Sequence, residues 1–282
     1  MISLLLALLL TPQAYAPEVE AVMNRSKARR EQAEQSAPPP AKAEAAASLP
    51  VPPEMAAPFQ ACVDAALESP DEGMAQANAW RLKGGGFYAR HCLAFAYARA
   101  ERWPPAIVAF EQAAEEAERA GAMPQSARLW AQAGNAALAG GDPTKARADL
   151  DAALARGIPD GLEKGEVHLD RARALVALGD PKGARESLDV ALEQAPQDPL
   201  GWLLSATLAR RSGEMPLAQA HVARAVKLSP DDASVALEEG NIAILTGHED
   251  VARSAWQRAV RLAPQSPAGK AAADNLTRLP AA

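Results

Sequence analysis

The chain has 282 residues and a formal net charge of −6, with 29 Lys and Arg against 35 Asp and Glu, and it is long enough for one or two domains that each bury a core. Apolar residues make up 49% but aromatic residues only 4%, and Ala alone accounts for roughly a quarter of the chain, which favours helices and argues against a β-sandwich or β-barrel. The lack of a long basic run argues against electrostatic binding of nucleic acid, and no apolar stretch approaches the roughly 18 residues of a membrane-spanning helix.

Residues 1–16 have the pattern of a secretory signal peptide. Residues 1–10 are nearly all Leu, Ile and Ala, and Ala14, Tyr15 and Ala16 form the small-x-small pattern of a cleavage site. We expect cleavage after Ala16 and export of the chain, with the periplasm as its location. Because no Lys or Arg precedes the apolar run, an uncleaved anchor and a misassigned start stay open as alternatives.

Residues 17–57 are predicted to form an extended, disordered tether rich in Pro and Ala. The part from 36 to 53 contains Pro38, Pro39, Pro40, Pro50, Pro52 and Pro53, and the whole stretch has no aromatic residue. Such a composition cannot bury enough apolar surface to offset the entropy of ordering. Residues 18–35 could form a short helix, but the apolar heptad pattern lasts barely two repeats there, which is too short to predict a coiled coil.

The rest of the chain repeats itself with a period near 34 residues. Four glycines mark the period, Gly141, Gly179, Gly213 and Gly247, and they are separated by 38, 34 and 34 residues. Each is followed at fixed offsets by a small, a larger and a small apolar residue: Ala146, Leu150 and Ala153; Ala184, Leu188 and Ala191; Ala218, Val222 and Ala225; Ala252, Trp256 and Ala259. Upstream, Ala106, Phe110 and Ala113 repeat the pattern once more. Offsets of four and three residues are those of one helical face.

The residues around these glycines predict a turn between two helices. Asp142 and Pro143 follow Gly141 directly, and Asp180 and Pro181 follow Gly179. This order supplies a glycine that can take a positive φ at a helix end, an Asp that caps the next helix, and a Pro suited to its first turn. Each unit is therefore predicted to be a helical hairpin.

This pattern resembles the tetratricopeptide repeat, which has a bulky residue at position 4, Gly or Ala at 8, Gly at 15, Ala at 20, a larger apolar residue at 24 and Ala at 27. Units begin at residues 87, 127, 165, 199 and 233, and Glu101 replaces the turn glycine in the first of them. A degenerate hairpin at 58–83 precedes these units, and a cap helix at 267–279 follows them. The resemblance implies an all-α fold over residues 58–279, a right-handed superhelical solenoid of helix-turn-helix hairpins.

The resemblance also implies a concave groove lined by the first helix of each unit, where a partner peptide or helix would bind. Position 5 supplies an apolar row and position 9 a polar row, with one basic residue at position 2. The predicted groove residues are Arg128, Asn135, Leu169, Arg173, Leu203, Thr207, Leu237 and Asn241. The alternative is that these are ordinary solvent-facing residues, with a few Leu shielding the stack.

The carboxylate clamp that tetratricopeptide co-chaperones share is not predicted. Asn135 matches one clamp position, but Asp170 stands where Asn is needed, and Leu200 and Leu204 stand where a basic pair is needed. We therefore expect no ligand that depends on this clamp.

The two cysteines of the chain, Cys62 and Cys92, are predicted to form a disulfide. Each falls in the first helix of one of two consecutive hairpins, and an exported chain meets an oxidising compartment. The bond would pin the degenerate first hairpin to the regular units. Two small buried thiols are the alternative.

No arrangement of residues predicts catalysis, a metal site or a cofactor. His91 and Cys92 are adjacent and therefore point in different directions on a helix, and His168, His221 and His248 fall at unrelated repeat positions. We expect a protein-protein interaction scaffold of the cell envelope, not an enzyme, whose partner is another protein and neither nucleic acid nor a small-molecule substrate. A structural module that associates with its own copies is the alternative.

Overall fold

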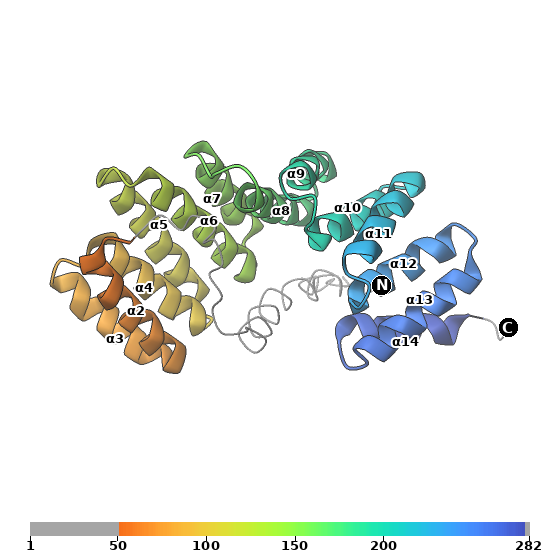
Figure 1. Cartoon of the computed structure of the whole chain (residues 1–282), viewed down its shortest axis with the longest axis horizontal. Helices are drawn as coiled ribbons and strands as arrows, with labels where there is room; N and C mark the ends of the chain where they lie inside the picture. Colours follow the sequence, from red (N-terminus) through yellow and green to blue (C-terminus); the bar gives the residue numbers. More distant parts are fainter. Residues whose placement is uncertain (1–50, 280–282) are drawn as a thin grey trace, which may run out of the picture. The chain divides into compact units, whose positions relative to one another are not determined.

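The computed structural model describes residues 51–279, and this part of the chain is entirely α-helical apart from the turns (Figure 1). The predicted signal peptide and most of the predicted tether lie outside these residues. The thirteen helices of the described part are α2 (Pro53–Glu68), α3 (Pro70–Leu82), α4 (Gly86–Arg99), α5 (Trp103–Arg119), α6 (Met123–Ala139), α7 (Pro143–Ala155), α8 (Leu162–Ala177), α9 (Pro181–Gln194), α10 (Pro199–Arg211), α11 (Met215–Leu228), α12 (Ala233–Leu245), α13 (Glu249–Leu262) and α14 (Pro267–Arg278). None of them is both long enough and apolar enough to cross a membrane.

The described chain divides into two compact units, residues 51–224 and residues 225–279, and α11 runs across the division. In the first unit each helix from α2 to α9 packs against the next one, and α2 also contacts α4 as α6 contacts α8. In the second unit α12 packs against α13, and α14 packs against both. The helix pairs α4/α5, α6/α7, α8/α9, α10/α11 and α12/α13 match the five predicted units, so the predicted all-α solenoid of hairpins is confirmed.

The turns inside the hairpins form as the sequence indicates. Gly141, Gly179, Gly213 and Gly247 have φ values of 76°, 74°, 77° and 80°. The side chain of Asp142 accepts a hydrogen bond from the backbone N–H of Lys145 at 2.9 Å, so it caps α7 as predicted. The left-handed glycine and the capping side chain together end one helix and start the next within three residues.

The periodic small residues lie inside the hairpins. Ala146, Ala184, Ala218 and Ala252 are all 0% exposed, and the larger residues four positions further on are almost fully buried as well. Each Ala lets the paired helices approach closely, and each larger side chain fills the space that remains. The core is therefore built from contacts between neighbouring helices, as the repeat pattern predicts.

One predicted boundary is wrong. The tether was expected to extend to residue 57 and the first hairpin to begin at 58, but α2 already begins at Pro53 and contains Pro58. Pro53 suits the first helical position because its ring fixes a helical φ and its missing N–H would have had no partner there. The prolines at 52 and 53 therefore start the helix, although the sequence pattern places them in the tether.

Candidate functional site

The first helices of neighbouring hairpins are joined by polar side chains within residues 51–224. The guanidinium of Arg128 on α6 donates from Nε and Nη2 to the two carboxylate oxygens of Glu163 on α8, both at 2.9 Å. Two parallel charge-assisted bonds of this kind fix the orientation of both side chains. Arg128, one of the predicted groove residues, therefore links α6 to α8.

A second link forms the polar strip, which we define as Asn135 on α6 together with Asp170 and Arg173 on α8. Nη1 of Arg173 donates to Oδ1 of Asp170 at 2.7 Å, and Asn135 hydrogen-bonds to the same carboxyl group. Burial raises the pKa of Asp170, while Arg173 and Asn135 oppose the rise because they stabilise the carboxylate. Asn135 is exposed, and Nη1 is the only nitrogen of Arg173 with a hydrogen bond in the described chain. The strip thus presents donors that a largely buried carboxylate holds in place.

Three predicted groove residues lie in the core instead. Leu169, Leu203 and Leu237 are each 4% exposed. Leu169 packs with Leu188, and Leu237 packs with Trp256. The prediction that these leucines form an open apolar row is wrong, because the Ala-rich second helices leave space inside the hairpins that the leucine side chains fill.

The remaining two predicted groove residues form hydrogen bonds with their own helix or with neighbouring helices. The hydroxyl of Thr207 donates to the carbonyl of Leu203 one turn earlier at 3.0 Å. Oδ1 of Asn241 accepts from Trp256 Nε1 at 3.2 Å and from Asn275 Nδ2 at 3.1 Å. Asn241 therefore joins α12 to α13 and α14, which gives its side chain a structural role.

An aromatic patch lies on α2 and α4, and the repeat pattern did not single it out. We define the patch as Phe59, Phe87, Tyr88 and His91. The ring of Phe59 is 6.2 Å from that of Tyr88 and 5.1 Å from that of His91, and the rings of Phe87 and Tyr88 are 4.1 Å apart. All four side chains are only partly buried. The available signal was the clustering of aromatic residues in this part of an aromatic-poor sequence.

His91 connects the aromatic patch to the next hairpin. Its Nε2 lies 2.8 Å from Oε1 of Gln132 on α6, so the neutral ring donates its proton to that amide oxygen. Burial lowers the pKa of His91 to about 4, and the bond to Gln132 opposes this only in part. At neutral pH the imidazole is therefore uncharged.

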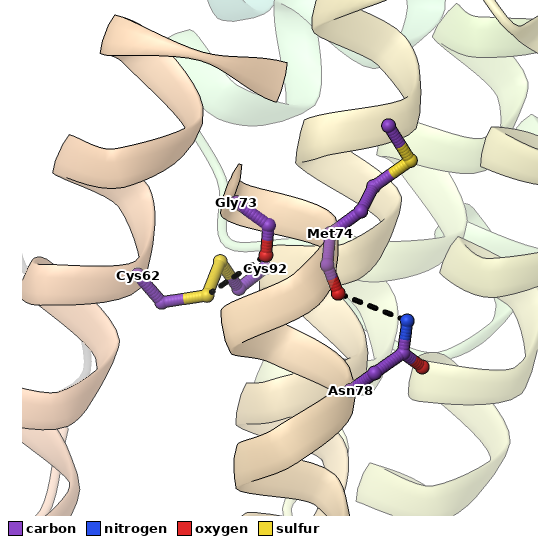
Figure 2. Close-up of a disulfide and its surroundings, with 5 residues drawn as sticks. All are labelled: Cys62, Gly73, Met74, Asn78 and Cys92. Atoms are coloured by element: carbon purple, nitrogen blue, oxygen red, sulfur yellow. Dashed lines mark hydrogen bonds between the residues drawn. A yellow bond between two sulfur atoms is a disulfide. The ribbon is translucent and has the colours of Figure 1, made fainter. Parts of the chain in front are cut away.

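The predicted disulfide between Cys62 on α2 and Cys92 on α4 is present (Figure 2). Both cysteines are 0% exposed, and Sγ of Cys62 lies 3.8 Å from the carbonyl oxygen of Gly73 on α3. A Cβ added at Gly73 would lie 2.4 Å from Cβ of Ala66, so α2 and α3 approach each other very closely here. The bond therefore ties the first hairpin covalently to the second.

This chain is an α-helical repeat protein. It consists of successive helical hairpins, and polar side chains form hydrogen bonds between the first helices of neighbouring hairpins. A family model described as the tetratricopeptide repeat matches residues 132–199 and 203–267, and these ranges contain the turn glycines and small residues described above. The chain therefore contains tetratricopeptide repeats over these two ranges.

Solved structures share the fold at low sequence identity. PilW, a widely conserved type IV pilus biogenesis factor, is 18% identical with a TM-score of 0.63, and the match covers 78% of this chain and 98% of PilW. pilF from Pseudomonas aeruginosa is 16% identical with a TM-score of 0.61, covering 79% and 99%. YrrB, a tetratricopeptide-repeat protein with an unusual peptide-binding site, is 18% identical with a TM-score of 0.51, covering 66% and 91%. No curated protein matches the sequence.

Proposed function

We propose that this chain is a non-catalytic scaffold of the cell envelope that holds a segment of a partner protein along the first helices of residues 51–224. The observation that carries the proposal is the polar strip of Asn135, Asp170 and Arg173, because its donors are fixed by a largely buried carboxylate while the Asn135 side chain faces solvent. Structural contacts alone would not require an exposed amide at this position.

The polar strip suits the backbone of an extended peptide. Every residue of such a peptide offers a carbonyl oxygen and, unless it is Pro, an N–H that needs a partner. The exposed amide of Asn135 can serve both groups, and the guanidinium of Arg173 can donate to a carbonyl. Since Asp170 already orders these side chains, binding would cost little additional side-chain entropy. Leu204 on α10, which is half-buried, offers an apolar contact in place of the buried Leu203.

The disulfide supports the proposed export to the envelope. Disulfides persist in oxidising compartments such as the periplasm and are rare in the reducing cytosol. Alkylation of thiols after the cells are quenched with acid and the protein is denatured without reductant tests this part of the proposal, because both cysteines are buried in the folded chain. We expect Cys62 and Cys92 to resist alkylation until a reductant is added; alkylation without reductant would contradict export.

Photo-crosslinking tests the binding face. A photoreactive p-benzoylphenylalanine at Asn135 should capture one partner protein in cell envelopes, because this side chain is exposed beside the polar strip. The matched control carries the same amino acid at Arg147, an exposed residue on the second helix α7. Circular dichroism at 222 nm verifies that both variants keep their helices.

We expect capture of the partner at position 135 and none at position 147. Capture at position 135 should fall at least several-fold when Arg173→Lys is added. Lys keeps the charge at 173 but cannot reproduce the planar fork of donors. Equal capture at both positions, or capture that Arg173→Lys leaves unchanged, would refute binding along this face.

A further inference from the structure

Aromatic residues are concentrated near one end of the array. Of the five Trp, three Tyr and four Phe in the chain, eight lie between residues 59 and 110. The regular units from residue 127 onward bury mainly Ala and Leu, so the fold itself does not demand this concentration. Most of the eight rings are only partly buried, and Phe110 is the fully buried exception at 4% exposure.

The aromatic patch combines aromatic rings with two hydrogen-bond donors that have no partner among residues 51–279. The hydroxyl of Tyr88 makes no hydrogen bond within residues 51–279, and the Nε2 amide of Gln132 makes none there either, because Gln132 bonds to His91 through its oxygen. Glu54 lies close enough to Tyr88 to act on its pKa. Phe59 and Phe87 also pack against the core, so the patch offers the exposed parts of partly buried rings, two donors and one nearby acidic group.

These features match the chemistry of a polyproline II segment. Such a segment has no internal hydrogen bonds, and its prolines have no N–H, so it offers carbonyl acceptors and flat apolar rings. Aromatic-lined surfaces bind this conformation because it is already extended and loses little entropy on binding. A surface with aromatic faces and spare donors meets both requirements.

We propose that residues 36–50 of this same chain dock on the aromatic patch. This proline-rich segment contains Pro38, Pro39, Pro40 and Pro50, and it leads directly into α2, the helix that carries Phe59. The segment carries one cationic side chain, Lys42, which is complementary to Glu54 beside Tyr88, and one acidic side chain, Glu44.

The connection is long enough for this docking. The eleven residue steps from Pro40 to Val51 span about 34 Å when fully extended as polyproline II, whereas Phe59 lies only about 9 Å along α2 from Pro53. A short tether of this kind raises the effective concentration of the segment to the millimolar range. An intrinsic dissociation constant near 0.1 mM would thus keep the patch occupied about nine-tenths of the time.

Docking in cis would make the patch self-occupied, so any other proline-rich ligand has to displace residues 36–50. This inference does not depend on the proposed partner binding at the polar strip, because the two sites share no residue, although Gln132 lies on α6 together with Asn135. Loss of photo-crosslinking at position 135 would therefore not contradict docking on the aromatic patch. Failure of the docking proposal would likewise not contradict partner binding at the polar strip.

Fluorine NMR of the full chain labelled with 3-fluorotyrosine tests the proposal. The label reports on three sites, Tyr15, Tyr88 and Tyr97, which single Tyr→Phe variants assign. The test variant carries Pro38→Ser, Pro39→Ser and Pro40→Ser. The matched control carries Ala45→Ser, Ala46→Ser and Ala47→Ser, which changes the same segment but keeps its prolines.

We expect the Tyr88 resonance to shift in the proline variant and to stay unchanged in the alanine control, with the Tyr97 resonance and the helical circular dichroism the same in both. A synthetic peptide of residues 34–52 should restore the Tyr88 resonance of the proline variant, with an apparent affinity about 10-fold higher than for the unmodified chain. An unshifted Tyr88 resonance, or equal peptide affinity for both proteins, overturns the proposal. A Tyr88 shift that depends on protein concentration assigns the segment to a second copy and overturns docking in cis.

Discussion

The turn between α4 and α5 contains a non-glycine residue in a conformation that favours glycine. Glu101 has a φ of 56° and is the one non-glycine residue with a positive φ in residues 51–279. Its N–H bonds to the carbonyl of Ala98, and the N–H of Arg102 bonds to that of Tyr97 at 2.9 Å. The equivalent turn at Gly141 has the same two bonds. The neighbouring structure therefore imposes the glycine geometry on Glu101.

Glu101→Gly should stabilise the protein. A left-handed conformation costs an L-residue roughly 1–2 kcal/mol, whereas glycine adopts it freely. Glycine in turn loses about 0.5–1 kcal/mol more backbone entropy on folding. The Glu101 side chain is exposed, so its removal sacrifices no packing. We expect a net gain of about 0.5–1 kcal/mol, or roughly 1–4 °C in Tm for a protein of this size.

Thermal unfolding followed at 222 nm measures the gain, and two variants serve as controls. Glu101→Ala removes the same side chain but keeps the strained φ, so its Tm should not rise. Gly141→Ala introduces the strain at the matching turn, where an added Cβ meets nothing within 4 Å, and should cost about 1 kcal/mol. If the Glu101→Gly and Glu101→Ala variants have the same Tm, the positive φ at residue 101 does not reduce the stability of the protein.

Three further predictions follow from the cores and the buried groups. Gly240→Ala should destabilise the protein by about 1–3 kcal/mol in chemical denaturation, because the new Cβ would lie 2.4 Å from Nε1 of the buried Trp256. The pKa of His91 is about 4 in the folded state against 6.5 when free, so the unfolded state binds more protons between these two pH values. The contribution of His91 to the free energy of unfolding is therefore complete above pH 6.5, and up to about 3 kcal/mol of it is lost as the pH falls to 4. The His91→Gln variant should lack this pH dependence in melts recorded at different pH values. Replacing Cys62 and Cys92 by Ser should cost on the order of 3 kcal/mol, and hydrogen exchange should place the loss in α2 and α3; uniform loss of protection would contradict that placement.

The hairpins could be predicted from the sequence because their determinants are local. A glycine, an Asp and a Pro within three residues specify each turn, as at Gly141, Asp142 and Pro143. Offsets of four and three residues specify the buried face of each second helix. The disulfide was also predictable, because the placement of two cysteines in consecutive first helices restricts their separation.

The site was predicted less well because its side chains depend on contacts between hairpins. Leu169 and Leu203 occupy positions that the family pattern assigns to a groove. In this chain both side chains are buried, because they fill the space that the Ala-rich second helices leave inside the hairpins. Asp170 was noted only as a departure from the co-chaperone clamp, although it organises Asn135 and Arg173. The distance between side chains on successive first helices is set by the packing of whole hairpins, which residue spacing within one hairpin does not specify.

The first hairpin shows how one feature of the fold affects another. In a repeat array each unit is stabilised mainly by its neighbours, and among the described residues α2 and α3 have a neighbour on one side only. α2 buries only Cys62 and Ala66 fully, so the bond from Cys62 to α4 compensates for a small core. Because the same helix carries Phe59, the disulfide also fixes Phe59 relative to Tyr88 and His91. Reduction should therefore loosen the aromatic patch before it affects the polar strip on α6 and α8, and the Tyr88 fluorine resonance should broaden on reduction while Arg173-dependent crosslinking persists.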